Sequence, residues 1–155
     1  MVLRRKKALK KTALRKKAKA KTLGYYKNQY WTVFSRYIRI RDKGQCFTCD
    51  LKKPWKTMQA GHMVPRASGG LSLYFHEQNV HCQCYRCNIN LGGNGAVYAK
   101  NFVEKYGQDD FDEIMRLKDQ GYLKYGIEDY KQLTEEYKVK TDDILRKRRN
   151  KTLYS

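Results

Sequence analysis

Two Cys-x-x-Cys pairs are the residues in this sequence whose type and spacing point most directly to chemistry. The cysteines of the two pairs are Cys46, Cys49, Cys84 and Cys87. Between the pairs lie 34 residues that include all three histidines of the chain, His62, His76 and His81. Each pair can turn two thiolates toward one point, and four sulfur ligands at about 2.3 Å satisfy tetrahedral Zn²⁺ without leaving a position for substrate. The spacing therefore predicts a structural zinc site.

Disulfide bonds are the alternative for these cysteines. The chain has five cysteines, an odd number, and its basic N-terminal stretch is not followed by the apolar run of a secretory signal. Thiols stay reduced inside cells, so we expect an intracellular protein without a membrane span. The fifth cysteine, Cys82, does not repeat the spacing of the pairs and is predicted to be a small packed residue.

Charge is distributed unevenly along the chain. Lysine and arginine total 34 against 15 acidic residues, which gives a net charge of +19. Residues 1–22 hold 11 basic residues and no acidic one, whereas residues 100–145 hold 8 basic and 12 acidic residues. Each cation that neutralises a phosphate releases a counterion, so nucleic acid is the leading partner. Residues 1–22 are predicted to be a disordered basic arm; a solubilising tail or a targeting signal is the alternative.

The elements that must position the cysteines and histidines follow from periodicity. Apolar residues at helical spacing from Tyr26 predict an amphipathic helix that ends near Gly44. Residues 58–65 and 79–82 are predicted to be two strands of a hairpin, and a short helix carries the second cysteine pair. The turn of the first cysteine pair, Cys46 to Cys49, is called the first knuckle. A knuckle followed by a hairpin and a helix is typical of a treble-clef zinc module, so the fold class is α+β.

The part after residue 97 is predicted to be helical. Three segments with aromatic and apolar residues at helical spacing end at Gly107, near Gly121 and in the basic run from Arg146. We therefore divide the chain into the arm of residues 1–22, a zinc-stapled core of residues 23–97 with its N-terminal helix, and a helical extension of residues 98–155 with a basic C-terminus.

His62 is the candidate for catalysis. An imidazole on a strand that faces a helix N-terminus can take a proton from water beside a hard cation, and the cation would stabilise charge on a phosphate. Arg66 follows closely, and its planar fork matches two phosphate oxygens.

The sequence around these residues resembles a known group of enzymes. GHMVPRASGG, which begins at residue 61, and CYRCN, which begins at residue 84, are similar to motifs of the HNH, or His-Me finger, nucleases. Together YIRIRD, CFTC, AGH and NVHCQCYRCN resemble the phage NinG (Rap) recombination endonuclease family, whose cousins include the endonuclease VII group. The resemblance covers about residues 34–94.

The resemblance implies a fold, an activity and a setting. It implies a ββα-metal hairpin and helix inside the treble clef, flanked by helices and basic tails. It implies a metal-dependent DNA endonuclease that acts on branched recombination intermediates, a Holliday junction or a D-loop, in the cytoplasm of a bacterial host if the chain is phage-encoded. A symmetric cut at a junction would need two active sites, which makes a homodimer an expectation.

The resemblance also implies roles for single residues. His62 would be the general base, Asn79 would tie the hairpin together, and Asn88 would be the helix-borne ligand of a catalytic Mg²⁺ or Mn²⁺. The four paired cysteines would hold the structural zinc.

One position departs from the family pattern. Many HNH proteins carry a metal-binding Asp or His directly before the catalytic histidine, and here that residue is Gly61. His81 is our first choice to complete the metal shell, with Asn94 or Glu77 as alternatives, because imidazole suits transition metals. A structural role for His81 is the competing interpretation.

Basic residues in three places are candidates to contact DNA: the arm, the first helix, and the region from the hairpin to the second cysteine pair. They are Arg4, Arg5, Lys6, Lys7, Arg36, Arg39, Arg66 and Arg86. Two other functions fit the same sequence. One is a zinc module that binds DNA or RNA without cutting it, and the other is a sequence-specific HNH restriction or homing endonuclease.

Deletion of residues 1–21 should weaken DNA binding at low salt and flatten its salt dependence, because the arm would contribute phosphate contacts. The cleavage rate at saturating protein should stay close to that of the full chain. The measurement is the slope of log affinity against log salt concentration, and an unchanged slope would mean that the arm does not touch phosphate.

Overall fold

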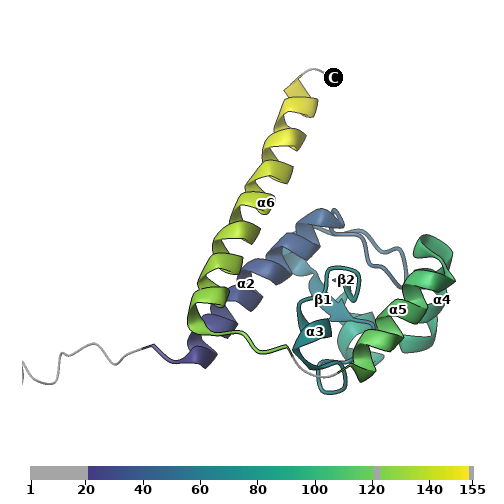
Figure 1. Cartoon of the computed structure of the whole chain (residues 1–155). Coiled ribbons are helices and arrows are strands. Elements are labelled where there is room, and N and C mark those ends of the chain that lie inside the picture. The colour runs from purple at the N-terminus through teal and green to yellow at the C-terminus, as the bar shows by residue number, and fades with distance from the viewer. Residues whose placement is uncertain (1–20, 121–122, 154–155) are drawn as a thin grey trace, which may run out of the picture.

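The computed structural model describes residues 21–120 and 123–153 and shows a mostly helical α+β fold (Figure 1). Its longer helices are α2 (Leu23–Arg41), α4 (Gly95–Tyr106), α5 (Gln108–Asp119) and α6 (Ile127–Leu153). Its shorter elements are a 3-10 turn (Trp55–Thr57), strand β1 (Gln59–His62), helix α3 (Gly70–Tyr74), strand β2 (Val80–Gln83) and a π-type turn, η2 (Arg86–Asn90). No helix in the described part of the chain has the length and apolar character needed to cross a membrane.

Helix α2 begins at Leu23, three residues before the apolar spacing that starts at Tyr26, and ends near Gly44 as predicted. The Thr22 hydroxyl accepts a hydrogen bond from the Tyr25 backbone N–H at 3.3 Å and so satisfies one unpaired donor of the first turn. At the other end Lys43 and Gly44 have φ angles of 56° and 69°, which reverse the chain. A side chain at Gly44 would collide with the Lys53 carbonyl, so this position requires glycine.

The hairpin is antiparallel and pairs Gly61 with His81 and His62 with Val80. Its first strand is shorter than predicted, and its second has the predicted length but is shifted by one residue. The Met63 N–H still donates to the Asn79 carbonyl at 2.9 Å, but the next residue leaves the ladder: the Val64 N–H donates to the Asn79 side chain at 2.8 Å instead of to a strand. Because the amide of Asn79 replaces the ladder here, the predicted first strand of residues 58–65 contracts to Gln59–His62 and the second begins one residue later than predicted.

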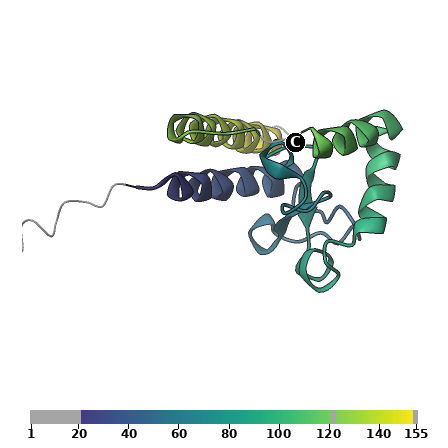
Figure 2. The ribbon, with the colours of Figure 1, turned by 60° about the horizontal axis from the view of Figure 1, so that its bottom comes forward.

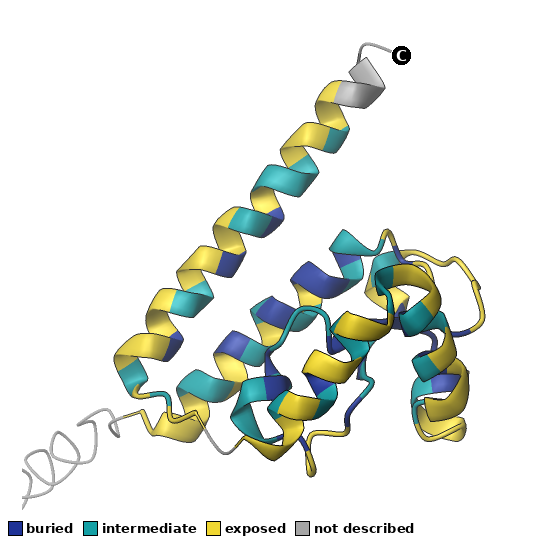
Figure 3. Ribbon diagram, turned by 45° about the vertical axis from the view of Figure 1, so that its right-hand side comes forward, coloured by how far each residue is buried: buried dark blue, intermediate teal, exposed yellow. Residues whose placement is uncertain are grey.

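Helix α6 packs along α2, and Figure 2 shows the two helices side by side. The rings of Tyr30 and Tyr130 lie 6.2 Å apart, those of Phe34 and Tyr137 lie 5.2 Å apart, and the Arg148 guanidinium donates to the Ile40 carbonyl at 2.7 Å. The contacts occur in the same order along both helices, so the two run parallel. The buried residues of α6 face α2, and its outer side is exposed (Figure 3).

The hairpin lies between this helix pair and the helices α4 and α5 (Figure 1). One side of the hairpin contributes Val80 to the cluster built around α2, while Phe102 of α4 and Ile114 of α5 pack with Val64 and Leu73 on the other side. The predicted core of residues 23–97 and the predicted extension of residues 98–155 therefore both contribute side chains to each of these two clusters.

Glu77 joins α2 to α6 through hydrogen bonds. Its carboxylate accepts from the Tyr37 hydroxyl at 2.9 Å and from the Tyr137 hydroxyl at 2.8 Å. Burial raises the pKa of Glu77, but these two hydrogen bonds and Lys140 more than offset that effect and leave the pKa below its ordinary value. The carboxylate is therefore the acceptor on which both tyrosines depend.

Glu77→Ala should lower the free energy of unfolding by about 2–3 kcal/mol, because it leaves two buried tyrosine hydroxyls without an acceptor. Urea denaturation measures this. Glu135→Ala is the matched control, since Glu135 is exposed and pairs with exposed Lys138, and it should cost less than about 1 kcal/mol. Equal losses in the two variants would contradict a structural role for Glu77.

Candidate functional site

The four paired cysteines meet at one point. Their sulfur atoms all lie within 4.8 Å of one another, and those of Cys49 and Cys84 are 3.8 Å apart. A tetrahedron of thiolates around Zn²⁺ has sulfur–sulfur edges of about 3.8 Å. None of the five cysteines is in a disulfide bond. The cluster could therefore hold a structural zinc, as the spacing predicts.

The first knuckle is held by its own backbone. The Cys46 N–H donates to the Leu51 carbonyl at 2.8 Å, and the Asp50 N–H donates to the Cys46 carbonyl at 3.0 Å, with Asp50 at a φ of 56°. Burial raises the pKa of the Cys46 thiol, but hydrogen bonds from Thr48 and from backbone N–H groups lower it to about 6. This thiol is thus set to ionise, as a metal ligand must.

Cys82 lies outside the sulfur cluster. It is buried on β2 opposite Ala60, and its backbone N–H donates to the Asp42 carboxylate at 2.7 Å. Burial, followed by the charge of Asp42, raises the pKa of its thiol to about 12. It is the small packed residue that the sequence predicts.

His62 is held in one orientation at the end of β1. Its Nε2 lies 2.9 Å from the Tyr74 carbonyl oxygen, and its ring stacks on Trp31 with centroids 5.3 Å apart and planes at 22°. A carbonyl can only accept, so Nε2 carries the proton. Nδ1 has no hydrogen-bond partner among the described residues and is therefore the acceptor of the ring. That is the form of imidazole that can take a proton.

The surroundings of His62 keep this ring neutral. Burial lowers its pKa to about 4; the hydrogen bond to the Tyr74 carbonyl opposes the shift, and the charge of Arg66 adds to it. At neutral pH the ring is thus almost wholly in the form that can accept a proton.

Arg66 lies beside His62, as its sequence position suggests. Its guanidinium lies 5.3 Å from the centroid of the Trp31 ring, and its Nη1 donates to the Tyr74 hydroxyl at 3.2 Å. Lys27 of α2 lies 4.5 Å from the centroid of the Tyr74 ring. Two cations, two aromatic rings and the imidazole therefore form one group, which we call the His62 cluster.

Trp31 and Tyr74 belong to this cluster although the sequence does not single them out. Trp31 lies on α2 beside the apolar spacing that predicts this helix, and Tyr74 lies on α3, a segment for which no element is predicted. The one signal in the sequence that could have pointed to Trp31 is that a large aromatic residue lies directly beside the apolar stripe of a helix.

Asn79 is fully buried and bonds in three directions. Its Oδ1 accepts from the Val64 N–H, and its Nδ2 donates to the carbonyls of Val64 at 3.2 Å and of Leu73 at 2.9 Å. The side chain thereby ties together the two ends of the segment between the strands, next to Tyr74.

Asn88 lies on η2 against β1. Its Nδ2 donates to Gln59 Oε1 at 2.6 Å, and its Oδ1 lies 2.8 Å from the position that a Cβ on Gly61 would occupy. Side chains alternate along a strand, so this amide and His62 lie on opposite faces of β1. The amide oxygen is thus directed at the place where the family pattern puts the missing ligand.

His81 is held by two tyrosines. It is fully buried, stacks on Phe47 at 4.0 Å between centroids, and lies 2.9 Å from the Tyr98 hydroxyl through Nδ1 and 2.7 Å from the Tyr106 hydroxyl through Nε2. Neither nitrogen is free to bind a metal in this arrangement, which fits a structural role for His81.

Two other candidates to complete the metal shell were Glu77 and Asn94. The Glu77 carboxylate joins α2 to α6 through Tyr37. Asn94 precedes α4, with a left-handed backbone at a φ of 53°.

The predicted DNA-contacting residues are divided among several surfaces. Arg36 and Arg39 lie 5.6 Å and 5.5 Å from the centroid of the Trp55 ring. Arg39 also donates to the carbonyls of Ser35 and Met58, so it is partly committed to the fold, whereas Arg36 and Arg86 are exposed. The predictions for Arg4, Arg5, Lys6 and Lys7 fall outside the described residues.

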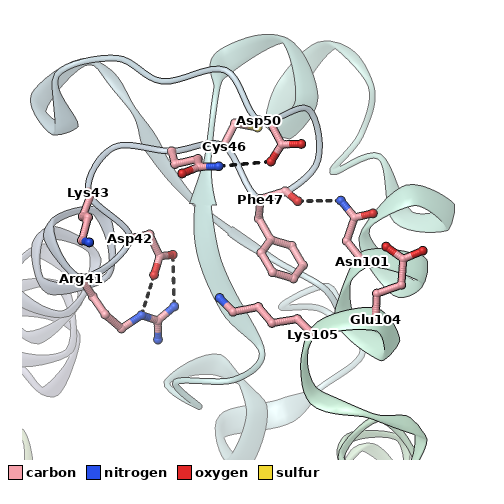
Figure 4. Close-up of a pocket in the computed structure, with 10 residues that line it drawn as sticks. Arg41, Asp42, Lys43, Cys46, Phe47, Asp50, Asn101, Glu104 and Lys105 are labelled. Atoms are coloured by element: carbon pink, nitrogen blue, oxygen red, sulfur yellow. Dashed lines mark hydrogen bonds and ion pairs between the residues drawn. The ribbon is translucent and has the colours of Figure 1, made fainter.

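A pocket of about 560 Å³ lies away from the His62 cluster (Figure 4). It is bounded by the end of α2, the first knuckle and α4, and its polar groups largely bond one another: Arg41 pairs with Asp42 at 2.7 Å, and Asn101 donates to the Phe47 carbonyl at 2.8 Å. Arg41 lies ten residues along α2 from Trp31, or about 15 Å. The pocket therefore marks a seam between elements and not the site of the candidate base.

The fold and the cysteine cluster define a small helical protein with a two-stranded hairpin that could be stapled by zinc. The family described as "NinG: Bacteriophage Lambda NinG protein" matches residues 2–147, so the chain belongs to the phage lambda NinG family. It is 30% identical over 132 residues to Protein ninG of Escherichia phage lambda and to Protein ninG of Salmonella phage P22. Each alignment covers 83% of this chain and 62% of the relative, so the chain spans less than two thirds of these relatives' length. No solved structure matches the chain.

Removal of zinc with a chelator should unfold the hairpin and η2, because metal binding worth about 10–16 kcal/mol contributes directly to folding in small zinc domains. The double variant Cys46→Ser/Cys87→Ser should show the same loss of near-ultraviolet circular dichroism. Cys82→Ala is the matched control and should keep its zinc. A double variant that retains native hairpin signals would show that the cluster is not a structural staple.

Proposed function

We propose that this chain is a metal-dependent DNA endonuclease of the HNH, or His-Me finger, type, in which His62 is the general base. The observation that carries the proposal is the orientation of His62, which keeps Nε2–H on the Tyr74 carbonyl and leaves Nδ1 as a neutral acceptor. In this proposal the hairpin and η2 form the ββα-metal unit of a treble-clef module stapled by the four cysteines.

The reaction is hydrolysis of a phosphodiester bond. Nδ1 of His62 takes a proton from water while the water oxygen forms a bond to phosphorus. The bond from phosphorus to the 3′ oxygen breaks, the 3′ oxygen leaves with the electron pair, and solvent protonates it. Stacking on Trp31 and the hydrogen bond to Tyr74 hold the ring in one orientation, so the proton acceptor is already in place before substrate binds.

A divalent Mg²⁺ or Mn²⁺, when bound, would supply charge that stabilises the phosphate and the departing oxygen. The Asn88 amide oxygen fits such a hard cation, since its own Nδ2 is already committed to Gln59. His81 has no free nitrogen and is not part of the proposed shell.

The substrate phosphate would bind beside the base. Arg66 stands over Trp31 next to His62, and its exposed guanidinium can donate two hydrogen bonds to phosphate oxygens. Lys27 adds a second positive charge on the Tyr74 side of the cluster, and the basic arm would add contacts that do not depend on DNA sequence.

The preference for branched recombination intermediates is proposed from the family resemblance alone, as is a homodimer that would cut both strands of a junction. A non-catalytic zinc module that binds nucleic acid is the second candidate. Gly61 favours it, because the family's acidic or imidazole metal ligand is absent there. A sequence-specific endonuclease would instead cut a linear duplex at one fixed site.

His62→Ala should slow cleavage of junction DNA by about 10²- to 10⁴-fold, the usual contribution of a positioned general base. Zinc content, thermal stability within a few degrees and DNA affinity should stay close to those of the parent. His76→Ala is the matched control, since His76 lies outside the His62 cluster, and it should cut at nearly the parental rate. The measurement is single-turnover cleavage with Mg²⁺ or Mn²⁺.

The same comparison at several pH values tests the state of the ring. Because burial lowers the pKa of His62 to about 4, the base is already deprotonated at pH 6. The ratio of parental to His62→Ala rates should therefore be constant from pH 6 to 8 and fall only as the pH approaches about 4. A ratio that rises tenfold or more with a midpoint near 6.5, or a His62→Ala variant that cuts at the parental rate, would contradict the assignment.

A further inference from the structure

Gly61 leaves a space on its face of the hairpin, and the neighbouring strand fills it. Gln83 of β2 lies on the same face, since Gly61 pairs with His81 and side chains two residues apart share a face. A Cβ added to Gly61 would collide with Gln83 Oε1 and lie 2.8 Å from Asn88 Oδ1. The two amide oxygens therefore converge on one small space above the Gly61 backbone.

The Gln83 amide is fixed in orientation and its oxygen is unpaired. Nε2 donates to the Gly93 carbonyl at 2.9 Å and to the Thr48 hydroxyl at 3.1 Å. A carbonyl cannot donate, so Nε2 must face Gly93 and Oε1 must face Gly61. Gln83 is fully buried, and its Oε1 has no hydrogen-bond partner. An unpaired buried acceptor is unfavourable by about 1–3 kcal/mol, so a native structure that keeps one needs an explanation.

Asn88 supplies the second oxygen. Its Nδ2 donates to Gln59 Oε1 at 2.6 Å, which turns Oδ1 toward the same space. Neutral amide oxygens are ligands of hard divalent cations, at about 2.0–2.6 Å from the ion, and such ions keep several water molecules when the protein offers few ligands. Two converging oxygens on one face fit this kind of partly hydrated site.

We propose that Gln83 Oε1 is a ligand of the divalent cation together with Asn88 Oδ1, and that it replaces the side chain that Gly61 lacks. The ligand is moved from β1 to the adjacent strand, and glycine at position 61 is what makes room for it. The use of this cation in catalysis rests on the proposed nuclease function, whereas the binding site itself does not.

Mn²⁺ binding tests the proposal without reference to cleavage. Free Mn²⁺ is measured by electron paramagnetic resonance during titration of the zinc-loaded full chain. Gln83→Leu should weaken Mn²⁺ binding by about 10- to 100-fold, while Gln29→Leu, a change at an exposed glutamine of α2, should leave it unchanged. Zinc content and thermal melting show whether each variant is folded.

Gln83→Glu tests whether Gln83 is a cation ligand if the Gln83→Leu variant does not fold. A carboxylate of the same length should bind Mn²⁺ more tightly than the parent, and Mn²⁺ should raise its melting temperature more than that of the parent. Gly61→Asp/Gln83→Ala, which returns the ligand to β1, should recover binding lost in Gln83→Ala. The proposal is overturned if Mn²⁺ affinity does not respond to Gln83→Glu or Gln83→Leu. In that case the side-chain amides of Gln59 and Asn88 would both be rotated by 180°, and Asn88 Nδ2 would donate a hydrogen bond to Gln83 Oε1.

The two proposals fail in different ways. If Mn²⁺ binding depends on Gln83 but the parent cuts no DNA, the site stands and the nuclease function falls. If the parent cuts DNA and Mn²⁺ binding is indifferent to Gln83, the function stands and this ligand assignment falls.

Discussion

The Asn79 side chain is the constraint on which the geometry of the candidate site depends. The segment between the strands has few ladder hydrogen bonds of its own, and the buried Asn79 amide supplies them by binding Val64 and Leu73. That fixes the position of α3 and of the Tyr74 carbonyl directly after Leu73. The carbonyl in turn sets the tautomer of His62. A buried amide with all its hydrogen bonds satisfied thus determines which nitrogen of a distant imidazole can accept a proton.

Burial leaves three polar side chains of this region in different states. For His62 it lowers the pKa to about 4, and the ring remains neutral, with one nitrogen that has no partner among the residues the structure describes. For His81 it also lowers the pKa, to about 2, but both nitrogens are paired with tyrosines and the residue only supports the fold. For Gln83 there is no charge to suppress, and burial leaves an acceptor without a partner. The number of hydrogen-bond partners, and not burial itself, separates the candidate functional groups from the structural ones.

Local patterns in the sequence predict local structure well here. The spacing within each Cys-x-x-Cys pair and the apolar period of α2 depend on residues a few positions apart, and the cysteine cluster and the helix follow directly. The ends of the strands depend on Asn79, whose partner Val64 is fifteen residues away. The hydrogen bonds of His81 depend on Tyr98 and Tyr106, and only the fold that brings α4 to the hairpin shows that both of its ring nitrogens have partners.

Strand register is a second feature that could not be predicted from local patterns in the sequence. Gly61 appears in the sequence as the loss of a ligand, because only its neighbours along the chain are visible. Pairing of β1 with β2 places the Gln83 side chain beside Gly61, so the Gln83 amide fills the space that Gly61 leaves. In the same way, α6 belongs to the core because Tyr130 and Tyr137 meet α2, a contact between segments about one hundred residues apart.

The central claim is that His62 is a neutral base with its proton on Nε2, and nitrogen-15 NMR of the histidine rings measures this directly. In the zinc-loaded protein, long-range proton–nitrogen correlations for His62 should show the Nε2–H tautomer at pH 7, with an unprotonated Nδ1 and no change in either nitrogen between pH 8 and pH 5.5. An Nδ1–H tautomer, or a titration of the ring with a midpoint near 6.5, would contradict the account.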